Sequence, residues 1–516
     1  MSRTADHDVI IIGGGHNGLV AAAYLAKAGR RVIVLEARER LGGAVASEKI
    51  FDGVDARLSR FAYLVSLLPD KIIKELELDL ELRSRSVASY TPTDAGGLLI
   101  EHPVGEATRA SFRQVTGSSE EYDRWWHLAD QLQDVADVVA PTLTDPLPRA
   151  SVVRHSLGSQ LWTALVERPI GEFLETALLD DTVRGLVATD ALIGTFASTN
   201  DPSLKQNQCF LYHVIGNGSG EWRVPVGGMG QVASELIEAA KNAGALLCTG
   251  TEVAWVQPDL SGGGVVALAD GSLHGAPFIL ANCPPVVLHK LLGSRRAVPE
   301  GCQIKINLVV RRLPRLRSGI DPSVGFAGTL HLAEGYRRLQ QAYEEAAAGR
   351  IPDPLPCEVY CHTLTDQVVL SSELSRAGYH MLTLFGLQTP TRLFVADPVA
   401  AREKAERAAL HALQAVLAEP LRDCLATDPK GRPCVEVMTP LDIEAALGMP
   451  GGHIFHGDLA WPWLADDSVA AAPEERWGVA TGYPGIFCCG SGAVRGGGVS
   501  GIGGQNAAEA VLESAI

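Results

Sequence analysis

Asp8-Val-Ile-Ile-Ile-Gly-Gly-Gly-His-Asn-Gly18 begins the stretch that decides the fold, and Val32-Ile-Val-Leu-Glu36 ends it. The four apolar residues before Gly13 predict a buried parallel strand, and the second apolar run predicts its neighbour. An Ala-rich segment, residues 19–28, predicts the helix between the two strands, and Gly29 closes that helix. A strand, a glycine turn, a helix and a second strand in this order are typical of a Rossmann-type βαβ unit.

The glycines of this unit have the G-x-G-x-x-G spacing. Gly13 allows the tight turn, Gly15 lets the backbone approach a pyrophosphate, and Gly18 lets the helix pack closely on the strand. The helix N-terminus presents unpaired N–H groups to the anion. Glu36 follows about 20 residues later, where a carboxylate holds ribose hydroxyls and repels a 2′-phosphate. The unit therefore predicts dinucleotide binding.

A second glycine motif, Arg40-Leu-Gly-Gly-Ala44, follows the second strand directly. It resembles the extended FAD signature of the amine-oxidase and phytoene-desaturase flavoproteins, many of which have Arg where this chain has Ala44. The resemblance implies a non-covalent FAD. It implies cofactor contacts at Gly13, Gly15, His16, Asn17, Gly18, Glu36, Ala37, Arg38, Gly42, Gly43, Ala44, Val253, Gly490, Ser491, Val499, Gly501 and Ile502.

Further motifs extend this resemblance nearly from end to end. They include Gly227-Gly-Met-Gly230, Ile454-Phe-His-Gly457 and the Gly-rich turn of residues 496–507 before the final helix. Together they resemble the phytoene-desaturase-like FAD oxidoreductases of the amine-oxidase superfamily, in the branch named for pyridine nucleotide-disulphide oxidoreductase domain-containing protein 2. The family usually has His-Pro where this chain has Val494 and Arg495, so we expect a cation near the flavin.

The expected fold is α/β, with a Rossmann-type FAD-binding domain assembled from discontinuous segments. We assign residues 1–100, 222–290 and 441–516 to that domain. Residues 101–221 and 291–440 then form an α+β substrate domain, with a mixed sheet facing the flavin and a helical cap. Strand patterns at 304–310, 357–361 and 380–385, and amphipathic helical patterns within 105–215 and 400–417, predict the elements of the substrate domain. Residues 84–101 alternate as strands do, within the first segment of the FAD-binding domain.

The segment from Arg57 to Leu68 has apolar residues at roughly helical spacing. One interpretation is a buried helix. The other is that its polar positions, Ser59 and Tyr63, lie near the flavin.

Composition limits the partners and the location. The chain has 516 residues and a net charge of −16, which argues against nucleic acid and against broad electrostatic docking on anionic membranes. No apolar run is long enough to span a bilayer, and the N-terminus is too short and polar for a signal peptide. We expect a cytoplasmic protein, for which peripheral hydrophobic contact with a membrane stays open. The ten cysteines lack ligand spacing, so we expect reduced thiols and no metal site.

The resemblance implies an FAD-dependent oxidoreductase that abstracts hydride from an apolar organic substrate, in the manner of a desaturase or dehydrogenase. Oxygen or a quinone would then accept the electrons. His456, Tyr63 and Arg495 are the candidate catalytic residues; His456 comes first, because the family places its segment beside the flavin and an imidazole titrates near neutral pH.

Three alternatives stay open: a flavin amine oxidase, a double-bond isomerase or saturase, and a non-catalytic flavoprotein scaffold. An amine oxidase needs an aromatic cage, which Trp461 and Trp463 could supply. Disulphide reductase chemistry is not expected, because no cysteine occurs before Cys209. A dedicated NAD(P)H site is not expected either, because no second unit has strand, GxGxxG, helix, strand and acid in order. The oligomeric state is not indicated.

Overall fold

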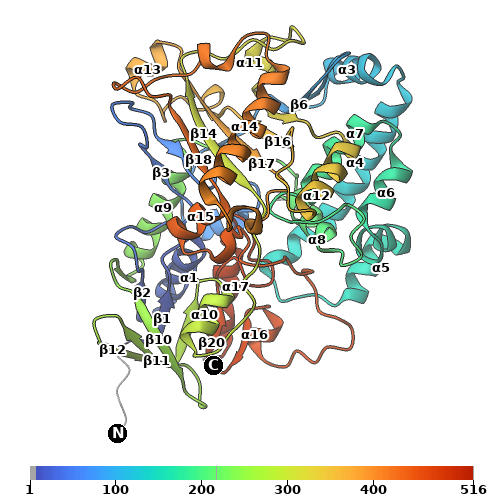
Figure 1. The fold of residues 1–516 in the computed structure, drawn as a ribbon. Coiled ribbons are helices and arrows are strands. Elements are labelled where there is room, and N and C mark those ends of the chain that lie inside the picture. Colours follow the sequence, from blue (N-terminus) through green and yellow to red (C-terminus); the bar gives the residue numbers. More distant parts are fainter. Residues whose placement is uncertain (1–6, 217, 515–516) are drawn as a thin grey trace.

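A computed structural model describes residues 7–216 and 218–514. Its lower part in Figure 1 is a six-stranded sheet in the order β19-β20-β13-β1-β2-β9. The bounds of these strands are β1 Val9–Ile12, β2 Val32–Leu35, β9 Leu246–Cys248, β13 Phe278–Ala281, β19 Ala480–Tyr483 and β20 Ile486–Cys488. All pairs are parallel except that of β19 with β20. Segments from both ends and the middle of the chain thus build one sheet, as a discontinuous Rossmann-type domain requires.

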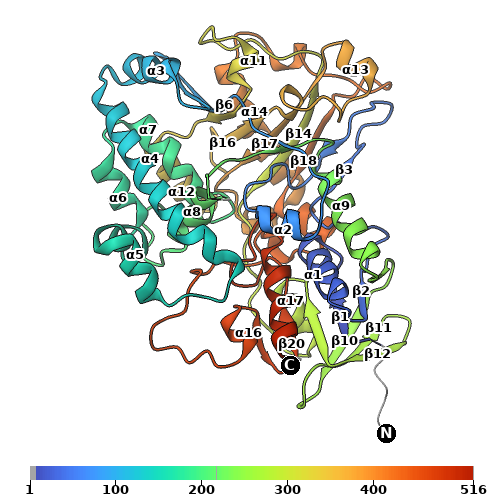
Figure 2. The ribbon, with the colours of Figure 1, turned by 180° about the vertical axis from the view of Figure 1, so that it is seen from behind.

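Helices and a small sheet cover the two faces of this sheet. One face packs on α1 (His16–Lys27), α9 (Met229–Asn242) and α17 (Ile502–Ser514), which lie together in Figure 2. The other face packs on the antiparallel strands β10 (Val253–Pro258), β11 (Gly264–Leu268) and β12 (Leu273–Ala276) and on α10 (Pro285–Leu291). Coverage on both faces explains why β1 is apolar at every position.

The upper part is a mixed seven-stranded sheet in the order β18-β14-β17-β16-β15-β6-β7. Its strands are β6 Val87–Thr93, β7 Gly96–Glu101, β14 Ile304–Val310, β15 Thr329–Leu332, β16 Cys357–Tyr360, β17 His380–Gly386 and β18 Val435–Met438. The pairing of β6 with β15 places residues 87–101 in this upper sheet. The sequence-based assignment of 1–100 to the FAD-binding domain was therefore wrong for β6 and for most of β7.

A helical layer lies beside the upper sheet in both ribbon views. It comprises α3 Glu106–Thr116, α4 Glu120–Val139, α5 Ala150–Trp162, α6 Ile170–Ala177, α7 Asp181–Ala188 and α8 Lys205–Ile215, with α12 Tyr336–Ala347 packed on it. On the other side of the upper sheet, α14 (Pro398–Val416) packs on the even-numbered positions of β14. The remaining elements are β3 Ser47–Glu48, β4 Leu58–Ser59, α2 Asp70–Glu75, β5 Leu82–Arg83, β8 Val224–Pro225, α11 Pro322–Gly325, α13 Ser372–Arg376, α15 Pro440–Leu447 and α16 Pro473–Arg476.

The segment from Arg57 to Leu68 is not a helix, so that interpretation was wrong. Apart from β4 it is extended and bent, because its main chain bonds to neighbours on several sides. Ala62 N donates to Ala44 O, and Val65 exchanges hydrogen bonds with Arg223. Its apolar residues therefore fill the junction between the two sheets rather than one face of a helix.

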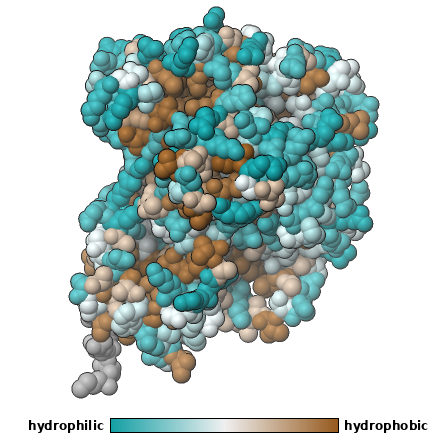
Figure 3. All heavy atoms as spheres, in the orientation of Figure 1, coloured by the Kyte–Doolittle hydropathy of each residue, from teal (hydrophilic) through white to brown (hydrophobic). Residues whose placement is uncertain are grey.

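The molecular surface is largely hydrophilic on the face drawn in Figure 3, and hydrophobic residues gather in patches where the upper and lower parts meet. No helix within residues 7–216 and 218–514 combines the length and apolar character needed to cross a bilayer.

Candidate cofactor and substrate site

A cavity opens at the carboxyl ends of β1 and β2, where a Rossmann-type sheet binds nucleotides. The predicted cofactor residues that line it are Gly13, Gly15, His16, Glu36, Ala37, Arg38, Gly43, Ala44, Val253 and Ser491. We call it the nucleotide cavity. The N-terminus of α1 stands at this cavity, since His16 is the first residue of that helix and Gly15 precedes it. Its unpaired N–H groups suit a pyrophosphate.

Glu36 is fixed by the main chain on either side of it. Its Oε2 accepts from Gly14 N at 2.7 Å and its Oε1 from Arg38 N at 3.0 Å. Both carboxylate oxygens keep further lone pairs for a ligand. The side chain is 7% exposed and lines the cavity, so it is held ready to accept from ribose hydroxyls.

The glycines at this turn are required by close contacts. A Cβ on Gly18 would lie 2.5 Å from Gly13 O, and a Cβ on Gly15 would lie 3.0 Å from Asn282 Nδ2. Gly13 itself has φ +100°, a conformation that side chains rarely adopt. The backbone thus leaves the space in front of Gly15 for a ligand.

Other predicted cofactor residues do not line the nucleotide cavity but pack against the elements that form it. Asn17, Gly18, Gly42, Gly490, Gly501 and Ile502 line neither this cavity nor the apolar one described next. Gly490 packs on the Asn282 main chain, and Gly501 packs on Val20. His16 Nε2 lies 3.1 Å from Gly498 O, which joins the first helix to the C-terminal glycine turn. Burial lowers the pKa of His16 to about 4, so its imidazole is neutral.

A second cavity lies between the two sheets; we call it the apolar cavity. Its apolar lining includes Phe61, Leu64, Ile193, Phe385, Met438, Ile443, Ile454, Phe455 and Val499. The two cavities share His16, Ala44, Leu447, Met449 and Ser491. A ligand with a nucleotide end and a flat ring end can therefore extend from one cavity into the other.

The three predicted catalytic residues lie in three different places. Tyr63 lines the apolar cavity. His456 lines the nucleotide cavity instead, with φ +64° and a buried Nδ1 that has no hydrogen-bond partner among the described residues. Burial, with the neighbouring His16 and His453, lowers its pKa to about 3. This position does not suit a base that acts on a substrate in the apolar cavity.

Arg495, the third predicted catalytic residue, lines neither cavity. Its guanidinium donates to the main-chain oxygens of Thr142 and Asp145, at 2.8 and 2.6 Å, and of Trp477, at 3.0 Å. It is 1% exposed, and burial lowers its pKa to about 10. Arg495 therefore ties the glycine turn to the helical layer.

Trp461 and Trp463 do not form a cage at the apolar cavity. They stack on each other with ring centroids 5.1 Å apart, and Trp463 also contacts Trp162. Aromatic residues that do line the cavity include Tyr63 and Tyr360, with centroids 4.8 Å apart, and Phe385, which also contacts Tyr63.

Sequence reasoning missed the polar groups that the upper sheet presents to the apolar cavity. Lys305 on β14 and Glu358 and Tyr360 on β16 all line it. Alternating neighbours of these residues pack against α14 on the opposite face of the sheet. The signal was present as single polar residues between apolar ones in Ile304-Lys-Ile-Asn-Leu and Cys357-Glu-Val-Tyr-Cys.

Lys305 is held in an unusual setting for an amine. Its Nζ donates to Ser59 O and Phe61 O, both at 2.6 Å, and lies 4.7 Å from the centre of the Tyr63 ring. Burial lowers the pKa of Lys305 well below its usual value. These two hydrogen bonds help to hold residues 57–68 in their irregular, non-helical conformation.

The fold and the nucleotide cavity define a protein with a Rossmann-type dinucleotide-binding domain, and comparison with known proteins agrees. Residues 11–70 match the family described as NAD(P)-binding Rossmann-like domain. An uncharacterized protein of Mycobacterium tuberculosis is 47% identical, with 98% of this chain and 97% of that protein covered. Pyridine nucleotide-disulfide oxidoreductase domain-containing protein 2 of Rattus norvegicus is 31% identical, with 98% and 93% covered.

The chain therefore belongs to the family of pyridine nucleotide-disulfide oxidoreductase domain-containing protein 2. Its fold is also that of a solved amine oxidase. The structure of a wild-type putrescine oxidase bound to putrescine superposes with a TM-score of 0.57 at 18% identity, with 99% of each chain covered. At this identity the likeness to putrescine oxidase is one of fold.

Proposed function

We propose that the chain binds one FAD non-covalently and uses it to oxidise an apolar organic substrate. The observation that carries this proposal is the junction of the two cavities at His16, Ala44 and Ser491. The adenosine and pyrophosphate fit the glycine-lined nucleotide cavity, and the ring system fits the junction. When bound, the isoalloxazine supplies a two-electron oxidant that accepts hydride.

The protein's own residues bind the cofactor and prepare the substrate. Glu36 holds the ribose, and the α1 N-terminus holds the pyrophosphate. The apolar cavity excludes water and orients a substrate by shape, because most of its lining is hydrocarbon and aromatic. The proposed reaction is a dehydrogenation or desaturation, with oxygen or a quinone as the final acceptor. Peripheral contact with a membrane would give access to a lipophilic substrate.

Anaerobic mixing of the purified protein with a panel of lipophilic compounds tests this function. A substrate should bleach the flavin absorbance in a single turnover, and it should do so more slowly when Phe385→Ala opens the apolar lining. The matched control is Phe173→Ala in α6, which lines neither cavity. If no apolar compound reduces the bound flavin while small polar amines do, the substrate class is wrong.

A second candidate is amine oxidation. The Tyr63 and Tyr360 pair at the apolar cavity favours it, since aromatic faces hold a cation or its neutral amine well. Under this alternative, amines should drive peroxide release, and Tyr63→Phe should retain more turnover than Tyr63→Ala.

A further inference from the structure

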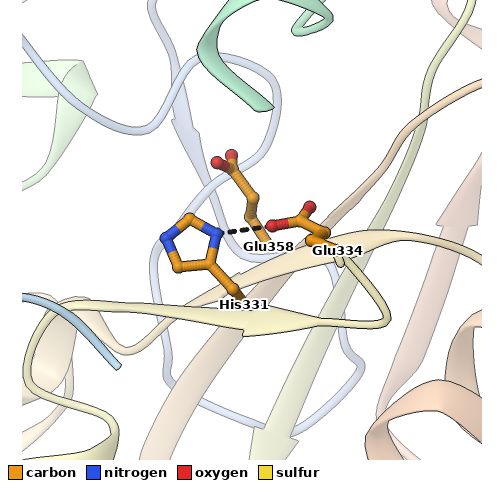
Figure 4. A group of neighbouring side chains, drawn as sticks. All are labelled: His331, Glu334 and Glu358. Atoms are coloured by element: carbon orange, nitrogen blue, oxygen red, sulfur yellow. Dashed lines mark hydrogen bonds and ion pairs between the residues drawn. The ribbon is translucent and has the colours of Figure 1, made fainter. Parts of the chain in front are cut away.

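Three buried ionisable residues meet on the cavity-facing side of the upper sheet. His331 comes from β15, Glu334 from the turn after it, and Glu358 from β16. Figure 4 shows the His331 imidazole and the Glu334 carboxylate facing each other, with the Glu358 side chain beside them. One ligand atom of each lies within 4.8 Å of the others, and the three side chains are buried. Neither the sequence motifs nor the proposed flavin chemistry accounts for this group.

Short hydrogen bonds organise the three residues. His331 Nδ1 lies 2.5 Å from Glu334 Oε2, and Tyr360 Oη donates to Glu358 Oε2 at 2.6 Å. The His331–Glu334 pair can therefore hold a proton and pass it on.

The group lies between the apolar cavity and a route to the surface. Glu358 and Asp190 line the apolar cavity. Asp190 and His331 also line a third cavity, beside β6 and α4. That cavity reaches the exposed residues His102, Gln133 and Ser219. Asp190 thus lines both cavities. A proton released from Glu358 can therefore reach the third cavity, and from there solvent, through Asp190 or His331.

Burial and neighbouring acids make the Glu358 carboxylate, in its ionised form, a stronger proton acceptor than an ordinary carboxylate. The titratable groups that act on Glu358, His331 or Glu334 are Asp190, Tyr63, Tyr360 and Arg85, besides the three themselves. Burial raises the pKa of Glu358 to about 8, with Glu334 adding to the effect, and burial raises the pKa of Asp190 to about 6. Burial also raises the pKa of Glu334 well above its ordinary value. Two carboxyl groups in a dry site do not both ionise readily.

We propose that Glu358 accepts the substrate's proton and that Asp190 and the His331–Glu334 pair pass it to the outer cavity. The inference rests on the proposed function. One C–H bond of the substrate leaves as hydride, with its electron pair, to the flavin oxidant. The adjacent C–H bond, or an N–H bond in an amine, leaves its electrons to form the new double bond. Its proton forms an O–H bond on Glu358 and then reaches water through the relay.

The first test follows protonation without any substrate. Infrared spectra of the purified protein across pH should contain a buried carboxylic acid band that disappears as the pH rises through about 8, the value to which burial raises the pKa of Glu358. Glu358→Gln should remove that band, and Glu403→Gln, an exposed acid on α14, should leave it. Loss of the band in neither variant, or no titrating band at all, would overturn the proposal.

The second test follows the reaction in the flavin-loaded protein. Glu358→Gln should keep its bound FAD and slow anaerobic flavin reduction by about 10²-fold or more, the usual scale of general acid–base catalysis. The pH profile should lose its limb near 8. Glu334→Gln should slow the reaction less, because it acts through His331. Glu403→Gln should match the wild type. A normal rate and profile in Glu358→Gln would refute the relay while leaving FAD binding intact.

Metal analysis separates the relay from an ion at the same residues. The purified protein should carry no stoichiometric divalent metal, and added Zn²⁺ should not bind in a way that depends on Glu334 and Glu358. One tightly bound metal per chain, lost in Glu358→Gln, would overturn the proposal. Absence of bound FAD would instead defeat the proposed function, and the infrared result would still report on Glu358.

Discussion

Replacing Glu36 by Gln perturbs the nucleotide cavity with almost no change in shape. The carboxylate accepts from the main-chain N–H of Gly14 at 2.7 Å and of Arg38 at 3.0 Å. Glutamine retains one acceptor oxygen but turns an NH₂ donor toward the other N–H group. One of the two main-chain donors therefore loses its partner, and the other loses a charged one.

These two bonds form without FAD, so their loss lowers the free energy of unfolding, whereas the change in FAD affinity comes from the contact with the ribose. A buried donor left unsatisfied costs about 1–3 kcal/mol, and a hydrogen bond to a charged group contributes about 1.5–3 kcal/mol against about 0.5–1.5 kcal/mol for a neutral one. Glu36 is 7% exposed, so solvent replaces little of the loss. The same oxygens would accept from the ribose hydroxyls of a bound FAD, and a neutral amide would accept there more weakly than the carboxylate. Since about 1.4 kcal/mol is a factor of ten in affinity, we expect the FAD Kd to rise at least tenfold.

Titration of FAD into deflavinated protein, followed by flavin fluorescence, measures this change. Glu39→Gln is the matched control, because Glu39 is an exposed acid in the same loop that lines neither cavity. Melting temperatures of the FAD-free proteins show how much of the effect is on folding. An FAD affinity for Glu36→Gln equal to that of Glu39→Gln would refute the role given to Glu36.

Further predictions follow from other contacts. NADH and NADPH should reduce the bound flavin slowly or not at all, and rapid stoichiometric bleaching by either would reveal a second nucleotide site. His456→Ala should weaken FAD binding more than it slows flavin reduction, because His456 lines the nucleotide cavity; the reverse result would restore it as a base. Gly504→Ala should cost folded protein, since its Cβ would lie 2.0 Å from Asn17 O where α17 meets α1; normal expression and melting would count against that packing. The pKa of Glu358, raised to about 8 in the fold, means that the folded state binds more protons than the unfolded state between pH of about 4.5 and 8. Stability should therefore fall as the pH rises through that window, by roughly 1–4 kcal/mol, and Glu358→Gln should flatten the curve measured by denaturant unfolding.

The nucleotide half of the fold could be predicted from the sequence because its information is local. Val9 to Glu36 contains two strands, a helix and the turn glycines in one continuous stretch, and each residue type has one physical reason to be there. Strands β14, β16 and β17 were also predicted, since each is a short apolar run of its own. In contrast, β6 and β7 were assigned to the wrong sheet, because an alternating hairpin does not indicate which distant strand it pairs with.

The substrate half of the site could not be predicted, because its residues meet only through tertiary packing. Lys305 and Glu358 are single polar residues within apolar strands, and nothing local indicates that their face turns to a cavity while the other meets α14. The apolar residues between Arg57 and Leu68 happen to fall at helical spacing. The main chain of this segment forms hydrogen bonds with Ala44, Arg223 and Lys305 rather than the hydrogen bonds of a helix. Arg495 suggested a catalytic cation beside the flavin, but its partners are main-chain oxygens from residues more than 300 positions away and from Trp477.

The central claim is that the two adjoining cavities hold one FAD, and the most direct measurement is the flavin content of the purified protein. Denaturation should release one FAD per chain, identified by its absorbance and mass, since the binding is non-covalent. Gly15→Val should contain little flavin and should not recover it from added FAD, because its side chain would enter the space in front of the glycine turn. A colourless wild-type protein that takes up no FAD on addition would contradict the account.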